Sequence, residues 1–242
     1  MTISEQLFER YCHVGVIPFR RLPTGDTQTP DYEIVLCGTS VIIEIKELTP
    51  NDEERRAIQE LQENHSTNYG WTVGNRVRYK IDSAKRQLER LAGKFPGVLL
   101  LYDARPAPFH GVEPVDIMGA MYGCESIDIH VPDKPGEPVL FGMHRFGKGK
   151  KLRHDCHTYI SAIGALWERH VDGHLHIDFF NNIHGSQPLP FAGMVSRGDM
   201  TVYTLAPGMG NKYRGWARMV KDEEYEAANK ASDAISDTAP QG

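Results

Sequence analysis

The 242-residue sequence contains few cysteines, and none is placed to cross-link the chain or to bind zinc. The four cysteines stand at positions 12, 37, 124 and 156, and no two form a Cys-x-x-Cys pair. Isolated cysteines of this kind are typical of reduced thiols that pack inside a protein. The sequence therefore predicts neither a disulfide framework nor a structural zinc module.

Long hydrophobic runs are also absent. The densest apolar segments, 41–45 and 98–102, fall far short of the roughly 20 residues that a membrane-spanning helix needs. The first residues, MTISEQLFERY, are too polar for a signal peptide. We therefore expect a cytoplasmic protein without a membrane partner.

The composition, with 40% hydrophobic and 24% charged residues, is typical of a folded globular enzyme or binding protein. We expect one domain over residues 1–220, with a core at 3–103 and a β-rich extension at 104–220. Most of the net charge of -5 comes from 221–242, where six acidic residues accompany two lysines. We expect this acidic tail to begin as a helix and to end in disorder.

Two basic stretches stand out against this acidic background. Residues 76–94 carry seven Lys and Arg with two acidic residues, and residues 145–153 carry five Lys and Arg with none. Such stretches are often only solvated surface, but an enzyme that acts on a polyanion would need them beside its active site. The charge pattern thus leaves nucleic acid open as a partner.

The first half of the chain has the periodicity of an α/β protein. Apolar residues at helical spacing predict helices at 3–13 and 78–93, and the polar segment 51–64 predicts an exposed helix. Residues 65–75 are expected to form a loop. Two alternating segments around a Gly38-Thr39 turn predict a β-hairpin, and the apolar run 98–102 predicts a strand buried on both faces.

The second half carries weaker signals and no internal repeat. It predicts a helix near 116–122, followed by five short strands near 127–131, 139–143, 159–166, 175–180 and 201–205. The whole chain is therefore expected to be α/β, with a mixed sheet and a β-rich C-terminal half.

The hairpin separates an apolar face from a charged face. A turn centred on Gly38 and Thr39 would place Asp31 opposite Lys46 and Glu33 opposite Glu44. Strand alternation puts these four charged residues on one side. The other side receives Tyr32, Ile34, Leu36, Ile43 and Ile45. A surface ribbon with cross-strand ion pairs would show the same pattern.

The wording of this hairpin is more specific. Thr29-Pro30-Asp31 is followed, after twelve residues, by Glu44-Ile45-Lys46. This resembles the PD-(D/E)XK nuclease superfamily, which has the restriction-endonuclease-like fold. A helix with an acidic residue precedes the hairpin, and a helix and a buried strand follow it, as in that superfamily. The resemblance covers residues 3 to about 103.

The resemblance implies a metal-dependent nuclease, with DNA as the expected substrate. Asp31 and Glu44 would bind the metal together with Glu9 from the first helix, or with Glu5 as the alternative. Carboxylates this close repel one another unless a cation lies between them, and an all-oxygen site favours Mg²⁺ or Mn²⁺ over Zn²⁺. Lys46 would orient the attacking water or stabilise the developing charge.

The resemblance also implies a role for the helix after the hairpin. Gln87 is the candidate to lie beside the metal site, and Lys80 is the alternative. A polar side of the helix that faces solvent would explain both residues equally well. Lys80, Arg78 and Arg145 are expected to bind the substrate backbone. Many enzymes of this class act as homodimers, but nothing in the sequence identifies a dimer face.

Two other interpretations remain open at this stage. The same fold can serve as a non-catalytic nucleic-acid-binding or interaction module, although intact Asp31, Glu44 and Lys46 favour the enzyme. Alternatively, the histidine-rich second half could centre a metal-dependent hydrolase on His154, His174 and His176. That site would require these three side chains to lie within about 5 Å of one another, the range over which residues share a metal.

Overall fold

The computed structural model describes residues 1–23, 29–90, 93–109, 111–132, 134, 137–169, 171–207 and 213–219. The predicted tail, 221–242, lies outside the described residues. The helices are α1 (Ile3–Val14), α2 (Asp52–Asn64), α3 (Asn75–Glu89), α4 (Pro114–Met121) and α5 (Phe191–Met194). No described helix is long and apolar enough to cross a membrane.

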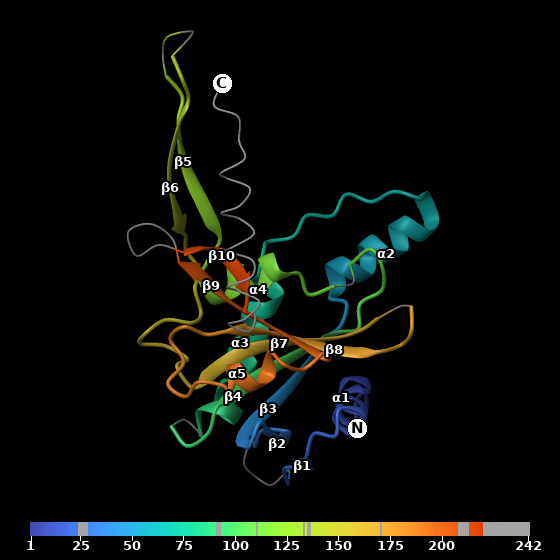
Figure 1. The fold of residues 1–242 in the computed structure, drawn as a ribbon. Coiled ribbons are helices and arrows are strands. Elements are labelled where there is room, and N and C mark those ends of the chain that lie inside the picture. The colour runs from blue at the N-terminus through green and yellow to red at the C-terminus, as the bar shows by residue number, and fades with distance from the viewer. Residues whose placement is uncertain are drawn as a thin grey trace, which may run out of the picture.

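An eight-stranded mixed sheet runs through both halves of the chain (Figure 1). Its strands, in spatial order, are β1 (Phe19–Arg21), β2 (Tyr32–Leu36), β3 (Thr39–Leu48), β4 (Gly97–Asp103), β7 (Ile160–Glu168), β8 (Leu175–Asn181), β9 (Met200–Pro207) and β10 (Tyr213–Arg218). Strands β1, β2 and β3 form an antiparallel meander, and β3, β4 and β7 are parallel. The predicted α/β class and mixed sheet are confirmed.

Helices cover both faces of this sheet, which therefore separates two hydrophobic cores. Helix α1 packs Phe8, Tyr11 and Cys12 against the face that carries Tyr32 and Ile43. Helices α3 and α4 cover the opposite face, with Val77, Ile81, Ala84, Leu88, Ile117 and Met121 among the buried side chains. The central strands are thus buried on both faces, as the apolar run 98–102 predicted.

Local sequence explains where the first two helices begin. The Thr2 side chain accepts the amide of Glu5, and the Glu5 carboxylate accepts the amide of Thr2, so both satisfy unpaired N–H groups of α1. Asn51 and Glu54 form the same reciprocal pair at the start of α2. Gly15 ends α1, as predicted.

The helices and strands predicted for residues 1–220 are all present, with shifted ends. Helix α3 begins at Asn75, three residues before the start at residue 78 that its apolar stripe predicted. The sequence reading missed β1, α5 and β10, which are short or lie next to loops. Because β1 completes the meander ahead of the hairpin, its omission hid one strand of the sheet around the candidate site.

The hairpin register differs from the prediction. The turn is formed by Cys37 and Gly38, which both have positive φ values (48° and 80°), so Leu36 pairs with Thr39 and Tyr32 with Ile43. A two-residue turn with left-handed backbone matches the twist of the strands better than the expected Gly-Thr turn. The pairing therefore shifts by two residues, and every side chain keeps its predicted face.

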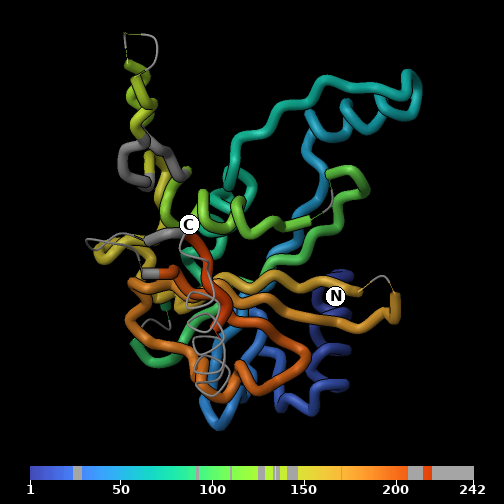
Figure 2. Tube along the Cα trace, turned by 45° about the horizontal axis from the view of Figure 1, so that its top comes forward, coloured from blue at the N-terminus to red at the C-terminus, as the bar shows by residue number. Residues whose placement is uncertain are grey.

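Two elements project from the body of the molecule (Figures 1 and 2). The hairpin of β5 (Glu125–His130) and β6 (Leu140–Phe146) forms one arm. Helix α2, with the segment that connects it to α3, forms the other. The second projection rises from the carboxyl end of β3 and so lies beside the candidate site.

Candidate functional site

Asp31, Glu44 and Lys46 lie together where β2 meets β3. The Asp31 amide donates to the Ile43 carbonyl (3.1 Å), and the Asp31 carboxylate accepts the Ile45 amide (2.7 Å). These two bonds hold Asp31 beside Glu44, which stands between Ile43 and Ile45. Lys46 Nζ lies 2.6 Å from Glu44 Oε1. Asp31 is therefore next to Glu44, and not opposite Lys46 as the expected register implied.

Glu44 is held in an environment that disfavours its charge. It is 2% exposed, and its Oε2 atom has no hydrogen-bond partner within the described part of the chain. Burial and the neighbouring Asp31 carboxylate raise the pKa of Glu44 to about 7, although Lys46 opposes the shift. Burial also raises the pKa of Asp31, against the Ile45 amide and Lys46. A buried carboxyl group and a half-buried one thus compete for one lysine.

A hard divalent cation would relieve this competition. The Asp31 and Glu44 oxygens are the ligand type that Mg²⁺ and Mn²⁺ prefer, and the unpartnered Glu44 Oε2 is a free acceptor. No group of three or more His, Cys, Asp or Glu side chains suited to a metal occurs among the described residues. Mg²⁺ commonly uses only one or two protein carboxylates and keeps several waters, so a third acidic ligand is not required for the predicted site.

Helix α1 presents two acidic residues toward β2 in different ways. Glu9 Oε1 accepts a hydrogen bond from the Tyr32 hydroxyl (2.7 Å), on the face of β2 that packs on α1. Glu5 pairs with Arg21 (2.6 Å), and its charge contributes to the raised pKa of Asp31. Glu9 therefore bonds to Tyr32, whereas the charge of Glu5 acts on Asp31, the predicted metal ligand.

Helix α3 contributes two of its predicted residues to this side of the sheet. Lys80 is partly buried, and burial together with the charges of Arg76 and Lys46 lowers its pKa. Gln87 has a buried Oε1 atom with no hydrogen-bond partner in the described chain. Like Glu44, it is an acceptor that lacks a donor.

Arg78 and Arg145, the other two residues predicted to bind the substrate, lie in different parts of the structure. Arg78 donates to the carbonyls of Gly149 (2.9 Å) and Gly119 (2.7 Å), so it ties α3 to α4 and to the loop after β6. Arg145 pairs with Ser126 along the β5–β6 arm, and its side chain lies outside the described residues.

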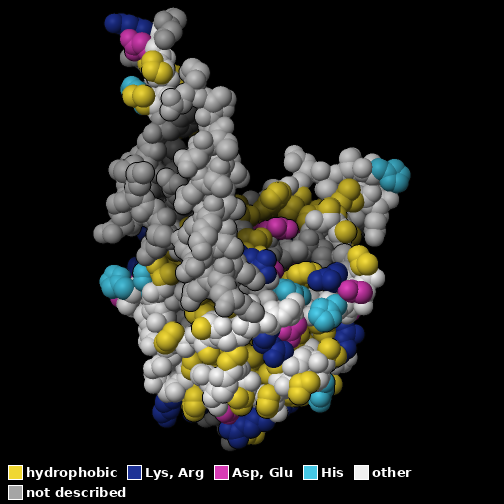
Figure 3. All heavy atoms as spheres, in the orientation of Figure 1, with side chains coloured by type: hydrophobic (Ala, Val, Ile, Leu, Met, Phe, Trp, Pro, Cys, Tyr) yellow, Lys and Arg dark blue, Asp and Glu magenta, His cyan; other side chains and the backbone are white. Residues whose placement is uncertain are grey.

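On the face seen in Figure 3, the Lys and Arg side chains that are drawn in colour lie scattered among acidic and apolar ones. Lys151 pairs with Asp82 (2.6 Å), and Arg153 with Asp155 (3.1 Å). These partners reduce the charge that the stretch 145–153 offers to a polyanion.

The three histidines of the alternative hydrolase site, which all lie among the described residues, do not converge on one point. His176, near the start of β8, bonds to Thr201 Oγ1 (2.9 Å), and its neighbour His174 is exposed. His154 instead lies near His184, whose pKa its charge helps to lower, and His184 follows the far end of β8. A seven-residue strand is about 23 Å long, so the spacing required for a site shared by His154, His174 and His176 is not met.

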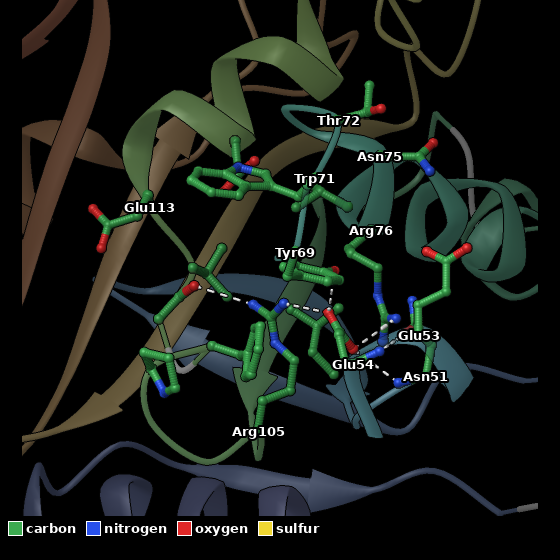
Figure 4. Close-up of a pocket in the computed structure, with 18 of the residues that line it drawn as sticks. Asn51, Glu53, Glu54, Tyr69, Trp71, Thr72, Asn75, Arg76, Arg105 and Glu113 are labelled. Atoms are coloured by element: carbon green, nitrogen blue, oxygen red, sulfur yellow. Dashed lines mark hydrogen bonds and ion pairs between the residues drawn. The ribbon is translucent and has the colours of Figure 1, made fainter. Parts of the chain in front are cut away.

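The sequence reading missed a cavity of about 570 Å³ beyond the carboxyl ends of β3 and β4 (Figure 4). Buried Glu54 forms its floor and bonds to Arg76 (3.0 Å) and Arg105 (2.9 Å). Arg105 also pairs with Asp103 (2.7 Å). The only sequence signal was the Asn51–Glu54 capping box, because the two arginines come from distant segments.

Comparison of the chain with protein-family models, with curated proteins and with solved structures found no match.

The raised pKa of Glu44 predicts an unusual pH dependence of stability without added divalent metal. Because the folded protein holds this proton up to about pH 7 and the unfolded chain only to about 4.5, the Glu44 contribution lowers the free energy of unfolding as pH rises between these values. The expected loss is on the order of 3 kcal/mol. Urea unfolding at several pH values in EDTA measures it.

Glu44→Gln should remove this loss, and Glu33→Gln is the matched control on the same hairpin. The Arg20 hydrogen bond lowers the pKa of Glu33, so its contribution has the opposite sign. If the Glu44→Gln and wild-type proteins lose stability equally between pH 5 and 7, Glu44 does not hold the proton.

Proposed function

We propose that the protein is a Mg²⁺-dependent nuclease with a restriction-endonuclease-like core, and that DNA is its substrate. The observation that carries this proposal is the placement of Asp31 beside buried Glu44, with Lys46 Nζ 2.6 Å from the Glu44 carboxylate. A carboxylate pair can hold a metal that assists phosphodiester hydrolysis, and a lysine beside it can stabilise the negative charge that develops.

The arrangement of elements supports the same proposal. Helix α1 precedes the β2–β3 hairpin, and α3 then crosses over to β4, which lies parallel to β3. This is the order helix, hairpin, helix and buried strand on which the resemblance to PD-(D/E)XK nucleases rests. Both site strands have a neighbouring strand on each side in the sheet, so their backbones are held on both sides.

The residues have separate tasks in such a reaction. A metal held by Asp31 and Glu44 would supply a Lewis acid for the phosphate and a water of lowered pKa. Lys46 pairs with Glu44 and would stabilise negative charge that develops on the phosphate. Lys80 adds a second positive charge close to Lys46, on the side from which α3 covers the strand.

A direct assay tests this function. The purified full chain is incubated with plasmid, linear duplex, single-stranded DNA and RNA, each with Mg²⁺, with Mn²⁺ or with EDTA. The expected result is cleavage of DNA with either metal and none in EDTA. Binding without cleavage under every condition would favour a non-catalytic nucleic-acid-binding module, and neither binding nor cleavage would remove both interpretations.

The position of Lys80 predicts a specific salt effect. If Lys80 contacts a substrate phosphate, Lys80→Gln should reduce the slope of log affinity against log salt by about 0.9 for duplex DNA. Binding is measured in Ca²⁺, which often supports binding without hydrolysis because its coordination is looser. Lys85→Gln is the control, since Lys85 is exposed on the outer side of the same helix. An equal change in both variants would indicate only a general charge effect.

A further inference from the structure

The cavity at the carboxyl ends of β3 and β4 adjoins the carboxylate–lysine site. Leu48, in its wall, follows Lys46 by two residues on β3 and faces the same side by strand alternation. Arg76, also in the wall, lies close enough to Lys80 to lower the pKa of that lysine, as does Lys46. Two residues of strand span about 7 Å, so the cavity wall at Leu48 begins about 7 Å along β3 from Lys46.

The cavity is bordered by flat aromatic side chains. Tyr69 and Phe109 pack edge to face, with ring centroids 4.9 Å apart, and join the segment before α3 to the segment after β4. Trp71 also lines the cavity and is 69% exposed, with its indole on the side toward Glu113 in Figure 4. An exposed indole at the mouth of a cavity is a ready stacking surface for a planar ring.

The charges of the cavity oppose an anion. Its lining contains four acidic residues and two arginines, and both arginines already bond to buried Glu54. A phosphate group would therefore meet a net negative surface, whereas a neutral ring with amino groups would meet acceptors. Glu53 and Glu113 are exposed in the lining and can accept from such amino groups.

Buried hydrogen bonds hold the floor of the cavity in place. Glu54 is fully buried and accepts hydrogen bonds from Arg76, Arg105, Tyr69 and the Asn51 amide. The Gly111 amide bonds to Asp103, which fixes the loop that carries Phe109. These contacts position Tyr69 and Phe109, so little ordering of these two rings is needed when a ligand enters.

We propose that this cavity binds an unpaired nucleobase of the substrate, stacked on Trp71, next to the phosphate at the Asp31–Glu44–Lys46 site. A base with an exocyclic amino group, such as adenine or cytosine, fits the acidic lining better than thymine. This inference rests on the proposed nuclease function and deepens it. It makes single-stranded DNA, or duplex DNA with an unpaired nucleotide, the preferred substrate.

The first experiment measures base binding without any cleavage. Full-length protein in EDTA is titrated calorimetrically with dAMP, dCMP, dTMP and 2-deoxyribose 5-phosphate, which lacks the base. The expected result is that dAMP and dCMP bind on the order of tenfold more tightly than the sugar phosphate. The affinity for dTMP should lie between that for these two nucleotides and that for the sugar phosphate. Trp71→Ala should remove this difference, and Trp71→Phe should restore part of it.

Tyr79→Ala is the matched control, because Tyr79 is an equally exposed aromatic residue on basic helix α3 that does not line the cavity. It should leave base binding unchanged. Equal binding of dAMP and the sugar phosphate by the wild type, or unchanged dAMP binding in Trp71→Ala, would overturn the inference. Circular dichroism confirms that each variant is folded.

The second experiment separates this inference from the nuclease proposal. Trp71→Ala should slow Mg²⁺-dependent cleavage of single-stranded DNA about tenfold more than cleavage of perfect duplex. Cleavage with no such difference would refute the base site and leave the nuclease intact. Base binding without cleavage of any substrate would refute the nuclease and leave a nucleotide site.

Discussion

Lys46→Ala is expected to reduce Mg²⁺-dependent DNA cleavage by on the order of 10²-fold or more and to leave DNA binding largely intact. The reason is the position of Lys46, whose Nζ lies at the buried Glu44 carboxylate where the reacting phosphate would be held. Its positive charge stabilises negative charge that develops only during the reaction, so its removal lowers the rate more than the affinity. Single-turnover cleavage and binding in Ca²⁺ measure the two effects separately.

Two variants make this result specific. Lys85→Ala removes the same charge from the exposed side of α3 and should change cleavage only slightly. Asp31→Asn keeps the shape of the site but removes a metal-binding charge, so cleavage should disappear at low Mg²⁺ and return in part at high Mg²⁺. If both Lys46→Ala and Asp31→Asn cleave at the wild-type rate, the active site lies elsewhere in the chain.

Glu54→Ala is expected to reduce the free energy of unfolding by about 3–5 kcal/mol, because it removes the buried carboxylate that Arg76 and Arg105 share and leaves Arg105 with Asp103 alone. Glu54 is fully buried, and the side chains of Arg76 and Arg105 are only 25% and 12% exposed. The ion pairs also join α2, α3 and the segment after β4, which surround the cavity. Urea unfolding measures this loss, provided that the slope m is the same for the variant and the wild type.

Glu53→Ala is the control for the preceding variant. It removes the same charge from the neighbouring position of α2, but Glu53 is exposed, so the loss should stay below about 1 kcal/mol. Similar losses for the two variants would assign the effect to the first turn of α2. A small loss for both would mean that the Glu54 ion pairs contribute little net stability.

The local pattern of the hairpin was sufficient to predict its two faces. Alternation places Tyr32, Ile34 and Ile43 in one core, and the structure confirms this. The same alternation survives the error in register, because a shift of two residues preserves the face of each side chain. The turn itself depends on left-handed backbone at Cys37, which a non-glycine residue seldom adopts, so no residue pattern predicted it.

The partner of each charged residue was not predictable in this way. Asp31 bonds to the Ile45 amide through its carboxylate, and Glu9 is engaged by the Tyr32 hydroxyl. Both contacts depend on how the chain enters β2 and how α1 rests on the sheet, and neither has a periodic signal. Glu5 and Glu9 are equivalent in sequence terms, one helical turn apart.

The sequence by itself determined the α/β class, the main helices and central strands, and the gathering of Asp31, Glu44 and Lys46 on one side of a hairpin. These features follow from local propensity and from repeats of 2 and 3.6 residues, which are written along the chain. Only the tertiary structure decided that Glu44 is buried, since this requires α3 to cover β3. Only it assembled the Glu54 cavity, whose walls come from segments more than fifty residues apart and are joined by side-chain contacts that leave no local pattern.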